Sequence, residues 1–244
     1  MQFFLYFIIM INFNQLSPYS HKNCHSNPKP ILKLWQDFYK NPNVVCEIKN
    51  LITHIDDYHD YQKKWRNDLS QNQNDDELTQ WLIHLFNSIF AQTNMDGVPT
   101  ILVRGDGEPE YFASRDGNPA RIEFAHGFFA SALHEISHWC VAGKKRRQLD
   151  DFGYWYVADG RDEVTQKLFE QVEIKPQAIE CLLNLALGRY FYVSQDNLNA
   201  DFDTSNSTFA SDVYLQAYDF LQNPQFLSKD AKRLIWLFLD LCCY

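Results

Sequence analysis

The sequence predicts an α+β protein: a helix-rich single catalytic domain with a small sheet, preceded by an N-terminal extension. Three observations predict this fold class. Apolar residues recur at helical spacing along much of the chain, while short β-branched or alternating runs occur chiefly near its middle. The 244 residues, 45% of them hydrophobic, can bury one core but hardly two independent ones.

Residues 1–76 are expected to form a divergent N-terminal extension that is partly helical. It opens with the apolar run MQFFLYFIIMI, which is shorter than the roughly 20 residues that span a membrane. No cleavage site typical of a secretory signal follows it. We therefore interpret it as a buried element or an over-extended start, with a signal or membrane anchor as the alternative. The polar stretch 70–76 predicts a linker.

Residues 77–244 are expected to form the metal-dependent catalytic domain. Its first helix carries an apolar stripe from Trp81 to Phe90. Strands are then predicted at residues 99–103 and 121–124, with a Gly-Asp-Gly turn and the segment 109–112 between them. A helix should run from about Phe128 to Ala142, and Gly143 stands where a left-handed residue would end it.

The basic run Lys144 to Arg147 follows this helix. We interpret it as a solvated helix end, where cations suit the helix dipole, with a docking patch for an acidic partner as the alternative. Two more helices are expected, one around residues 164–172 and one that Pro176 opens at its first position. A short strand at residues 190–193 and helices from Asp212 onward complete the chain.

Composition narrows the class of function. The formal net charge of −9 and pI near 5.3 argue against a broad nucleic-acid surface, which needs clustered basic residues. The six cysteines form no CxxC pair, so no zinc ribbon is expected, and Cys140 and Cys181 are predicted to be buried thiols. A cytoplasmic protein without membrane partners is the working hypothesis.

The motif His134-Glu135-Ile136-Ser137-His138 indicates a metal site. Histidines four residues apart lie on one face of a helix, so both imidazoles can reach a single ion. Glu135 lies about 100° further round the helix, where it can act beside the metal as a catalytic group without binding it. The alternative is a pair of buried histidines that bind no metal.

A third ligand is needed, and we favour Glu173 because a second helix could present it across the first. A capping or surface carboxylate is the alternative for Glu173. Asp150 and Asp151 could instead orient an imidazole. The full set of candidates is His126, Asp150, Asp151, Asp159, Asp162, Glu170 and Glu173.

Two chemistries fit two histidines and one carboxylate. With zinc, the metal activates water and Glu135 acts as general base, which gives a hydrolase. With iron, the open positions of a facial triad serve oxygen and substrate, which gives an oxygenase. The HExxH spacing alone favours the hydrolase.

The residues around the motif favour the oxygenase, because they resemble the elongation factor P hydroxylase family, also called the EpmC or YfcM family. The longest similar segment is RIEFAHGFFASALHEISHWCVAGKKRRQLDDFGYWYVADGRD, residues 121–162, and a second is VEIKPQA, residues 172–178. Weaker similarity covers WLIHLFNSIF, RGDGEPEY and YFYVSQDNLNADF. Residues 1–76 have no counterpart that we can place.

The resemblance implies hydroxylation of a lysine on translation elongation factor P that already carries a β-lysyl group. It also implies a divalent metal, Fe(II), held by His134, His138 and a carboxylate. The family fold is similar to that of YbeY-type ribonucleases, whose third ligand is a histidine. Here Lys144 stands in that stretch, so a carboxylate must complete the set.

A β-lysyl-lysine carries two ammonium groups, which acidic and aromatic side chains could bind. The expected substrate-binding residues are Asp150, Asp151, Asp159, Asp162 and Tyr154. For the aromatic residue, ordinary core packing is the alternative. The sequence identifies neither an electron donor nor a co-substrate.

Overall fold

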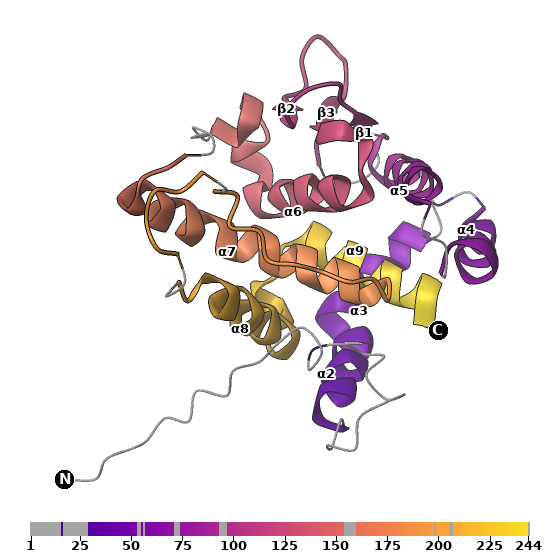
Figure 1. Ribbon diagram of the computed structural model, residues 1–244. Helices are drawn as coiled ribbons and strands as arrows, with labels where there is room; N and C mark the ends of the chain where they lie inside the picture. Colours follow the sequence, from indigo (N-terminus) through magenta and orange to yellow (C-terminus); the bar gives the residue numbers. More distant parts are fainter. Residues whose placement is uncertain are drawn as a thin grey trace.

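The computed structural model describes residues 16, 29–52, 55, 57–70, 74–92, 97–153, 160–197, 199–204 and 207–243. Two long helices, α6 (Phe129–Arg146) and α7 (Glu163–Ala186), lie side by side at its centre (Figure 1). The small sheet lies against α6, on the side away from α7, and α8 (Phe209–Gln222) and α9 (Lys229–Cys243) pack on α7. The helix-rich α+β prediction is confirmed.

The sheet has three strands in the order β1-β3-β2: β1 (Thr100–Arg104), β2 (Glu110–Phe112) and β3 (Ala120–Phe124). β3 runs parallel to β1 and antiparallel to β2. Its burial alternates along the strand, because side chains of successive residues point to opposite faces and one face packs on α6. β1 and β3 match the sequence prediction to within one residue at each end.

Side chains close both outer edges of this sheet. Asn87 of α5 (Asp75–Phe90) donates to the carbonyl of Leu102 at 3.1 Å and accepts from its amide at 2.7 Å. On the other edge, Asp151 accepts from the amide of Tyr111 and Asp150 from that of Ala113, each at 2.9 Å. These bonds satisfy backbone groups that a short sheet would otherwise leave exposed.

The N-terminal helices pack on α9. They are α2 (Lys29–Lys40), α3 (Pro42–Ile52), α4 (Tyr58–Lys64) and the π-helical turn η2 (Trp65–Leu69). Tyr39 stacks on Trp236 of α9 with ring centroids 4.8 Å apart, and its carbonyl accepts from the indole at 2.9 Å. One cluster of buried side chains joins this region to the sheet and α7. The predicted boundary at residue 76, between an N-terminal extension and a catalytic domain, stays a prediction.

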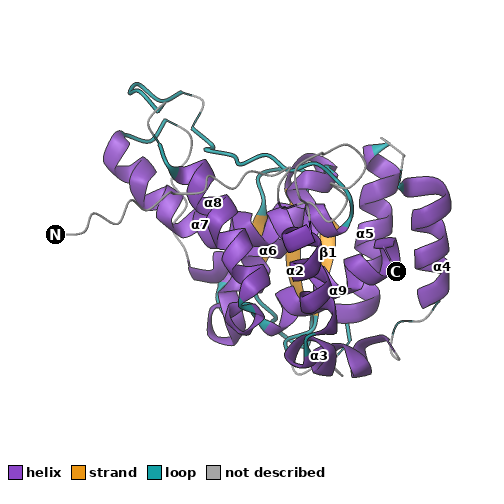
Figure 2. Ribbon diagram, turned by 90° about the horizontal axis from the view of Figure 1, so that it is seen from below, coloured by secondary structure: helices purple, strands orange, loops and turns teal. Residues whose placement is uncertain are grey.

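The helix α5 begins inside the stretch predicted as a linker. Asn74 is its N-cap, and its side chain accepts from the amide of Asp76. Acidic residues fill the first turn, where they suit the positive end of the helix dipole. At right angles to the first view, α4 and α5 lie at the opposite end of the molecule from α7 and α8 (Figure 2).

α6 is interrupted where the sequence predicted its end. Gly143 has φ 65° and ψ 172°, after which one more helical turn contains Lys144, Lys145 and Arg146. These three side chains are exposed, but Arg147, predicted to be solvated, is only 6% exposed. Its guanidinium donates to the carbonyl of Trp139 and pairs with Asp230 at 2.7 Å, so these partners replace its hydration.

α7 is one continuous helix and not the two that the sequence predicted. Pro176 lies inside it, although proline lacks the amide that would bond to the carbonyl four residues earlier. That defect costs about 3 kcal/mol. Burial of Ile179, Leu182 and Leu183, each contributing about 1.5–3 kcal/mol, outweighs it.

The predicted strand at residues 190–193 is wrong: these described residues form no strand. The segment 190–197, here called the strap, runs along α7 (Figure 1). Gln177 of α7 donates to the carbonyl of Ser194 at 2.8 Å and accepts from its amide at 3.0 Å. A side-chain amide thus takes the place of a neighbouring strand.

Some of the remaining sequence predictions concern described residues, and others concern residues outside the described ranges. Cys140 and Cys181 are buried free thiols, as expected. Among the described residues, no helix is long and apolar enough to span a membrane. The apolar run 1–11 lies outside the described residues, as do Tyr154 and Asp159. The YbeY-like fold stays a prediction.

Candidate metal centre

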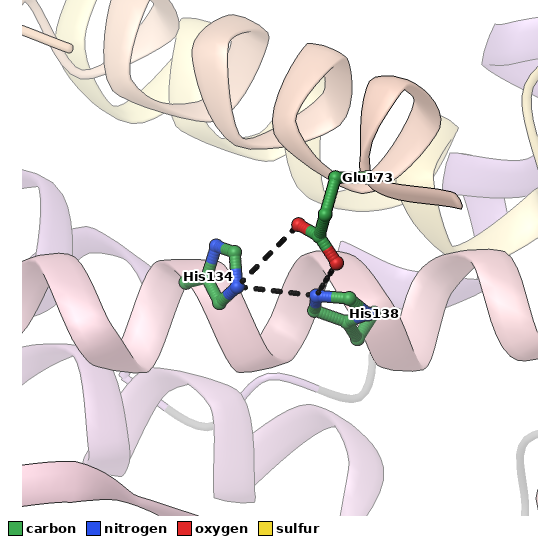
Figure 3. Close-up of side chains that lie close together, drawn as sticks. All are labelled: His134, His138 and Glu173. Atoms are coloured by element: carbon green, nitrogen blue, oxygen red, sulfur yellow. Dashed lines mark hydrogen bonds and ion pairs between the residues drawn. The ribbon is translucent and has the colours of Figure 1, made fainter. Parts of the chain in front are cut away.

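His134 and His138 turn toward α7 from neighbouring turns of α6 (Figure 3). Leu133, Ile136 and Ser137 are buried, which fixes the rotation of the helix and leaves the two histidines on the α7 side. The Nε2 atoms of the histidines lie 3.1 Å apart, and their ring centroids lie 4.7 Å apart. Two imidazole nitrogens therefore converge on one point.

Glu173 reaches the same point from α7 (Figure 3). Its Oε1 lies 3.2 Å from Nε2 of His138, and its Oε2 lies 3.8 Å from Nε2 of His134. Ligand atoms of the three residues all fall within 4.8 Å of one another. In the described part of the chain, no other group of histidine, cysteine or acidic residues meets this criterion.

The donor set fits a divalent transition metal. Two imidazoles and one carboxylate are ligands of catalytic zinc and of non-heme iron, and both leave positions open for water or substrate. Glu173 lies on α7 but in mid-helix, three residues before Pro176, and not ahead of a separate helix. Its role as a ligand stays a prediction, which this geometry supports.

Electrostatics link these groups tightly. Burial alone would raise the pKa of Glu173, but the charges of His138 and His134 and a hydrogen bond from His138 lower it to about 2. Burial alone would lower the pKa of His134, but the hydrogen bond and charge of Glu180, with the charge of Glu173, raise it to about 10. Without a bound cation, the neighbouring carboxylates therefore favour the protonated form of His134.

Glu180 is a member of this cluster that sequence reasoning missed. Its Oε2 lies 2.8 Å from Nδ1 of His134, and the residue is 8% exposed. A signal was present in the sequence: polar residues follow each other at intervals of three and four along α7, which places them on one face of the helix. This polar stripe is Gln166, Glu170, Glu173, Gln177, Glu180 and Asn184.

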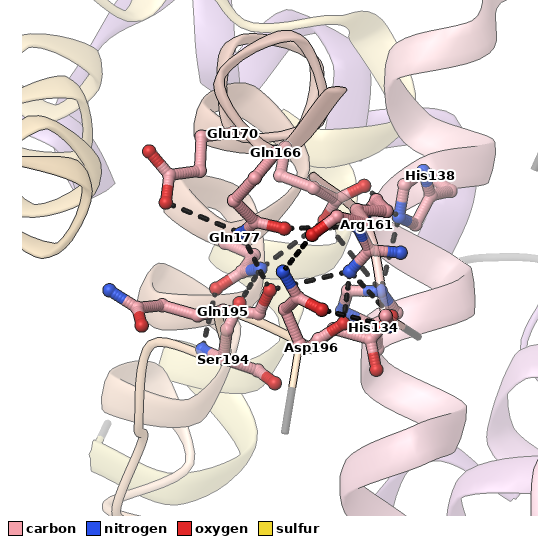
Figure 4. A network of polar contacts seen from close by, with 12 residues as sticks. His134, His138, Arg161, Gln166, Glu170, Gln177, Ser194, Gln195 and Asp196 are labelled. Atoms are coloured by element: carbon pink, nitrogen blue, oxygen red, sulfur yellow. Dashed lines mark hydrogen bonds and ion pairs between the residues drawn. The ribbon is translucent and has the colours of Figure 1, made fainter. Parts of the chain in front are cut away.

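The polar stripe also holds the strap and the start of α7 (Figure 4). Gln166 donates to the carbonyl of Gln195 at 2.9 Å and accepts from Arg161 at 3.0 Å. Arg161, which is buried, also donates to the carbonyl of Asp196. Gln177 donates to Oε2 of Glu173 at 3.3 Å, so the strap and the metal centre share one hydrogen-bond network.

Glu135, the predicted catalytic group, projects from the same helix as the histidines. Burial raises its pKa above the ordinary value; the two histidines oppose this, while Glu173 and Glu180 add to it. The pKa shift shows that Glu135 lies within the electrostatic field of the centre. A catalytic role for it stays a prediction.

The predicted substrate-binding aspartates lie in different places. Asp150 and Asp151 bond to the edge of β2, and Asp150 also pairs with Arg115 at 2.6 Å. Asp162 caps α7 by accepting from the amide of Thr165 at 2.8 Å. The structure gives these three carboxylates structural partners, and their role toward a substrate stays a prediction.

The remaining ligand candidates have other surroundings. His126 lies in the short turn η3 (Ala125–Gly127), with φ 55°, and its ring packs near Phe128. Glu170 accepts from Ser207 at 3.1 and 3.2 Å and from Gln166 at 3.3 Å. Neither joins the group of converging ligand atoms.

Together, the fold and the converging side chains define a helix-rich α+β protein with a candidate two-histidine, one-carboxylate metal centre. The chain belongs to the elongation factor P hydroxylase (EpmC) family, whose model matches residues 85–239. That match includes α6, α7 and every residue of the centre. The family resemblance expected from the sequence is confirmed.

A curated relative is similar over the same region. The elongation factor P lysine hydroxylase of Haemophilus influenzae is 52% identical over 115 residues. The match covers 47% of this chain and 65% of the relative, so the chain spans just under two thirds of that protein's length.

Proposed function

We propose that this chain is a metal-dependent hydroxylase, an oxidoreductase that acts on the β-lysylated lysine of translation elongation factor P. One observation carries the proposal: His134, His138 and Glu173 converge inside the region that matches the hydroxylase family. The relative's name describes a lysine hydroxylase of the same translation factor. Such a substrate suggests a cytoplasmic enzyme that needs no nucleic-acid or membrane partner.

The proposed metal is Fe(II), held by the two Nε2 atoms and the carboxylate of Glu173. Bound iron would supply oxygen activation, which redox-inactive zinc does not. The residues of the chain hold the ion and keep positions open beside it. In the overall reaction a C–H bond becomes C–OH with one atom of O2, and an external donor of two electrons reduces the other atom to water.

Substrate attraction follows from charge. The modified lysine carries two ammonium groups, and the chain has a formal net charge of −9. We propose that these groups are met by Asp150, Asp151, Asp159 and Asp162, with the ring of Tyr154. Glu135, half-buried on the same helix as the histidines, is proposed to hold or accept a proton during the reaction.

The test is a mass measurement. The full chain, loaded anaerobically with Fe(II), is mixed with β-lysylated elongation factor P, ascorbate and oxygen, and the modified peptide is weighed. We expect a gain of about 16 Da, the mass of one oxygen atom, that is absent for His134→Ala and for Glu173→Ala. Absence of the gain with wild-type protein, or its persistence in both variants, contradicts the proposal.

A zinc hydrolase is the second candidate, and the HExxH pattern, in which the pKa of the half-buried Glu135 is raised, favours it. It requires zinc in the purified protein and cleavage of a peptide or RNA that Glu135→Gln abolishes. Iron as the bound metal, with no cleavage by wild-type protein, argues against it. A structural metal would need a closed set of four ligands, and among the residues that the structure describes three ligand groups converge.

A further inference from the structure

We infer that Glu180 is a positioning residue, which holds His134 so that Nε2 faces the metal. The inference rests on the proposed metal site and deepens it. Nδ1 of His134 lies 2.8 Å from Oε2 of Glu180, while Nε2 is the atom that lies near His138 and Glu173. The two nitrogens of one ring therefore face different partners.

Hydrogen-bond chemistry fixes the tautomer in this arrangement. An ionised carboxylate only accepts hydrogen bonds, so Nδ1 of a neutral His134 must carry the hydrogen. The lone pair is then on Nε2, which faces the converging ligand atoms. A carboxylate beside the N–H also makes the imidazole a stronger donor to a metal.

Packing makes Glu180 a firm anchor. Its neighbours on α7, Ile179, Cys181 and Leu182, are all buried, and Glu180 itself is 8% exposed. The side chain of His134 is 30% exposed, so without an anchor its ring would face open space on one side. Within the described residues, a carboxylate lies against Nδ1 in His134 but not in His138.

The expected effect on metal affinity can be graded. Glu180→Gln keeps the shape and one acceptor oxygen but removes the charge, whereas Glu180→Leu removes the acceptor as well. Loss of such an outer partner typically weakens metal binding by about 10-fold to 100-fold. We expect about the lower figure for Glu180→Gln and about the higher one for Glu180→Leu.

Glu170→Gln is the matched control. It makes the same change in the same polar stripe, at a carboxylate whose partners are Ser207 and Gln166 and not a histidine. The affinity of the full chain for Co²⁺ is measured by visible absorption in competition with a chelator. Glu170→Gln should stay within about threefold of wild type, since its carboxylate does not touch a ligand.

A second readout separates positioning from a general loss of structure. In Zn²⁺-loaded protein with ¹⁵N-labelled histidine, long-range ¹H–¹⁵N spectra report which nitrogen of His134 carries hydrogen. Wild type should show the Nδ1–H form with a protected proton, and Glu180→Leu should lose that protection. A merely structural role would lower the unfolding temperature of the metal-free protein and leave this signature unchanged.

Three results would overturn the inference. They are Co²⁺ affinity of Glu180→Leu within about threefold of wild type, an unchanged histidine spectrum in that variant, or equal weakening in Glu170→Gln. Should Glu180→Leu fail to fold, the near-isosteric Glu180→Gln decides by its own affinity. If the wild-type protein binds no metal, both the proposed function and this inference are contradicted. If it binds metal with an affinity that does not depend on Glu180, only this inference is contradicted.

Discussion

The side-chain amide of Gln177 pairs with both backbone groups of Ser194, as one strand would pair with another. Gln177 is 1% exposed and also donates to Oε2 of Glu173. One side chain thus connects the strap to the candidate metal centre. A substitution of Gln177 should therefore alter both the strap and the surroundings of Glu173.

Gln177→Leu should loosen the strap. The amide and carbonyl of Ser194 lose their side-chain partners, and because Ser194 is exposed each lost hydrogen bond costs only about 0.5–1.5 kcal/mol in the free energy of unfolding. Amide hydrogen exchange at Ser194 should accelerate, as read by mass spectrometry, while urea unfolding measures the stability. Gln171→Leu, at an exposed position of the same helix, is the control and should leave exchange at Ser194 unchanged. Slow exchange in Gln177→Leu would contradict the assignment.

The stability of the metal-free protein should depend on pH through His134 and Glu173. The pKa of His134 rises from 6.5 to about 10 on folding, so its stabilising contribution is complete below pH 6.5 and is lost as the pH approaches 10. The pKa of Glu173 falls from 4.5 to about 2, so its contribution is complete above pH 4.5 and is lost as the pH approaches 2. These two groups therefore favour the window between 4.5 and 6.5.

Urea unfolding of chelator-treated protein at about pH 5.5 and about pH 9.5 tests this dependence. The free energy of unfolding should be lower at the higher pH, and the difference should shrink in His134→Gln. An equal pH difference in wild type and His134→Gln would assign the effect to other groups.

Gly143→Ala should destabilise the protein although there is room for the added methyl group. No atom lies within 4 Å of the position that a Cβ would occupy, but φ 65° with ψ 172° is a conformation that only glycine adopts readily. The expected cost is about 1–3 kcal/mol by thermal or urea unfolding. Gly107→Ala is the control, because its site is equally open and has no positive φ. Equal stability of the two variants would count against backbone strain.

Arg147→Leu should cost about 3 kcal/mol in the free energy of unfolding. The substitution leaves Asp230 with Arg233 as its remaining guanidinium partner and removes the donors to the carbonyl of Trp139. Lys145→Leu, on the exposed turn just before it, should stay within about 0.5 kcal/mol of wild type. A loss below about 1 kcal/mol in Arg147→Leu would mean that this buried pair is nearly neutral.

Local sequence patterns predicted those features of the fold that are determined by residues close together in the sequence. The alternation of residues 121–124 predicted β3, and the spacing of His134 and His138 predicted a shared helix face. The break at Gly143 followed from its position after an apolar helix. Each of these features is set by residues that lie within a few positions of one another.

The features that the sequence did not predict depend on distant partners. Arg147 is buried because Asp230 lies 83 positions away in sequence but 2.7 Å away in space. Pro176 stays inside α7 because α8 and α9 pack on that helix. Glu180 contacts His134 only because α6 and α7 pack side by side. A local sequence pattern does not predict which residues of two helices will meet.

The closed edges of the small sheet limit how a protein substrate could be recognised. Many proteins capture an extended peptide by adding it as an extra strand to an open edge. Here Asn87 occupies the middle of one edge, and Asp150 and Asp151 occupy the other. A visiting segment would have to displace these side chains first. A partner protein that presents a lysine to this chain is therefore better held by its folded surface than as a borrowed strand.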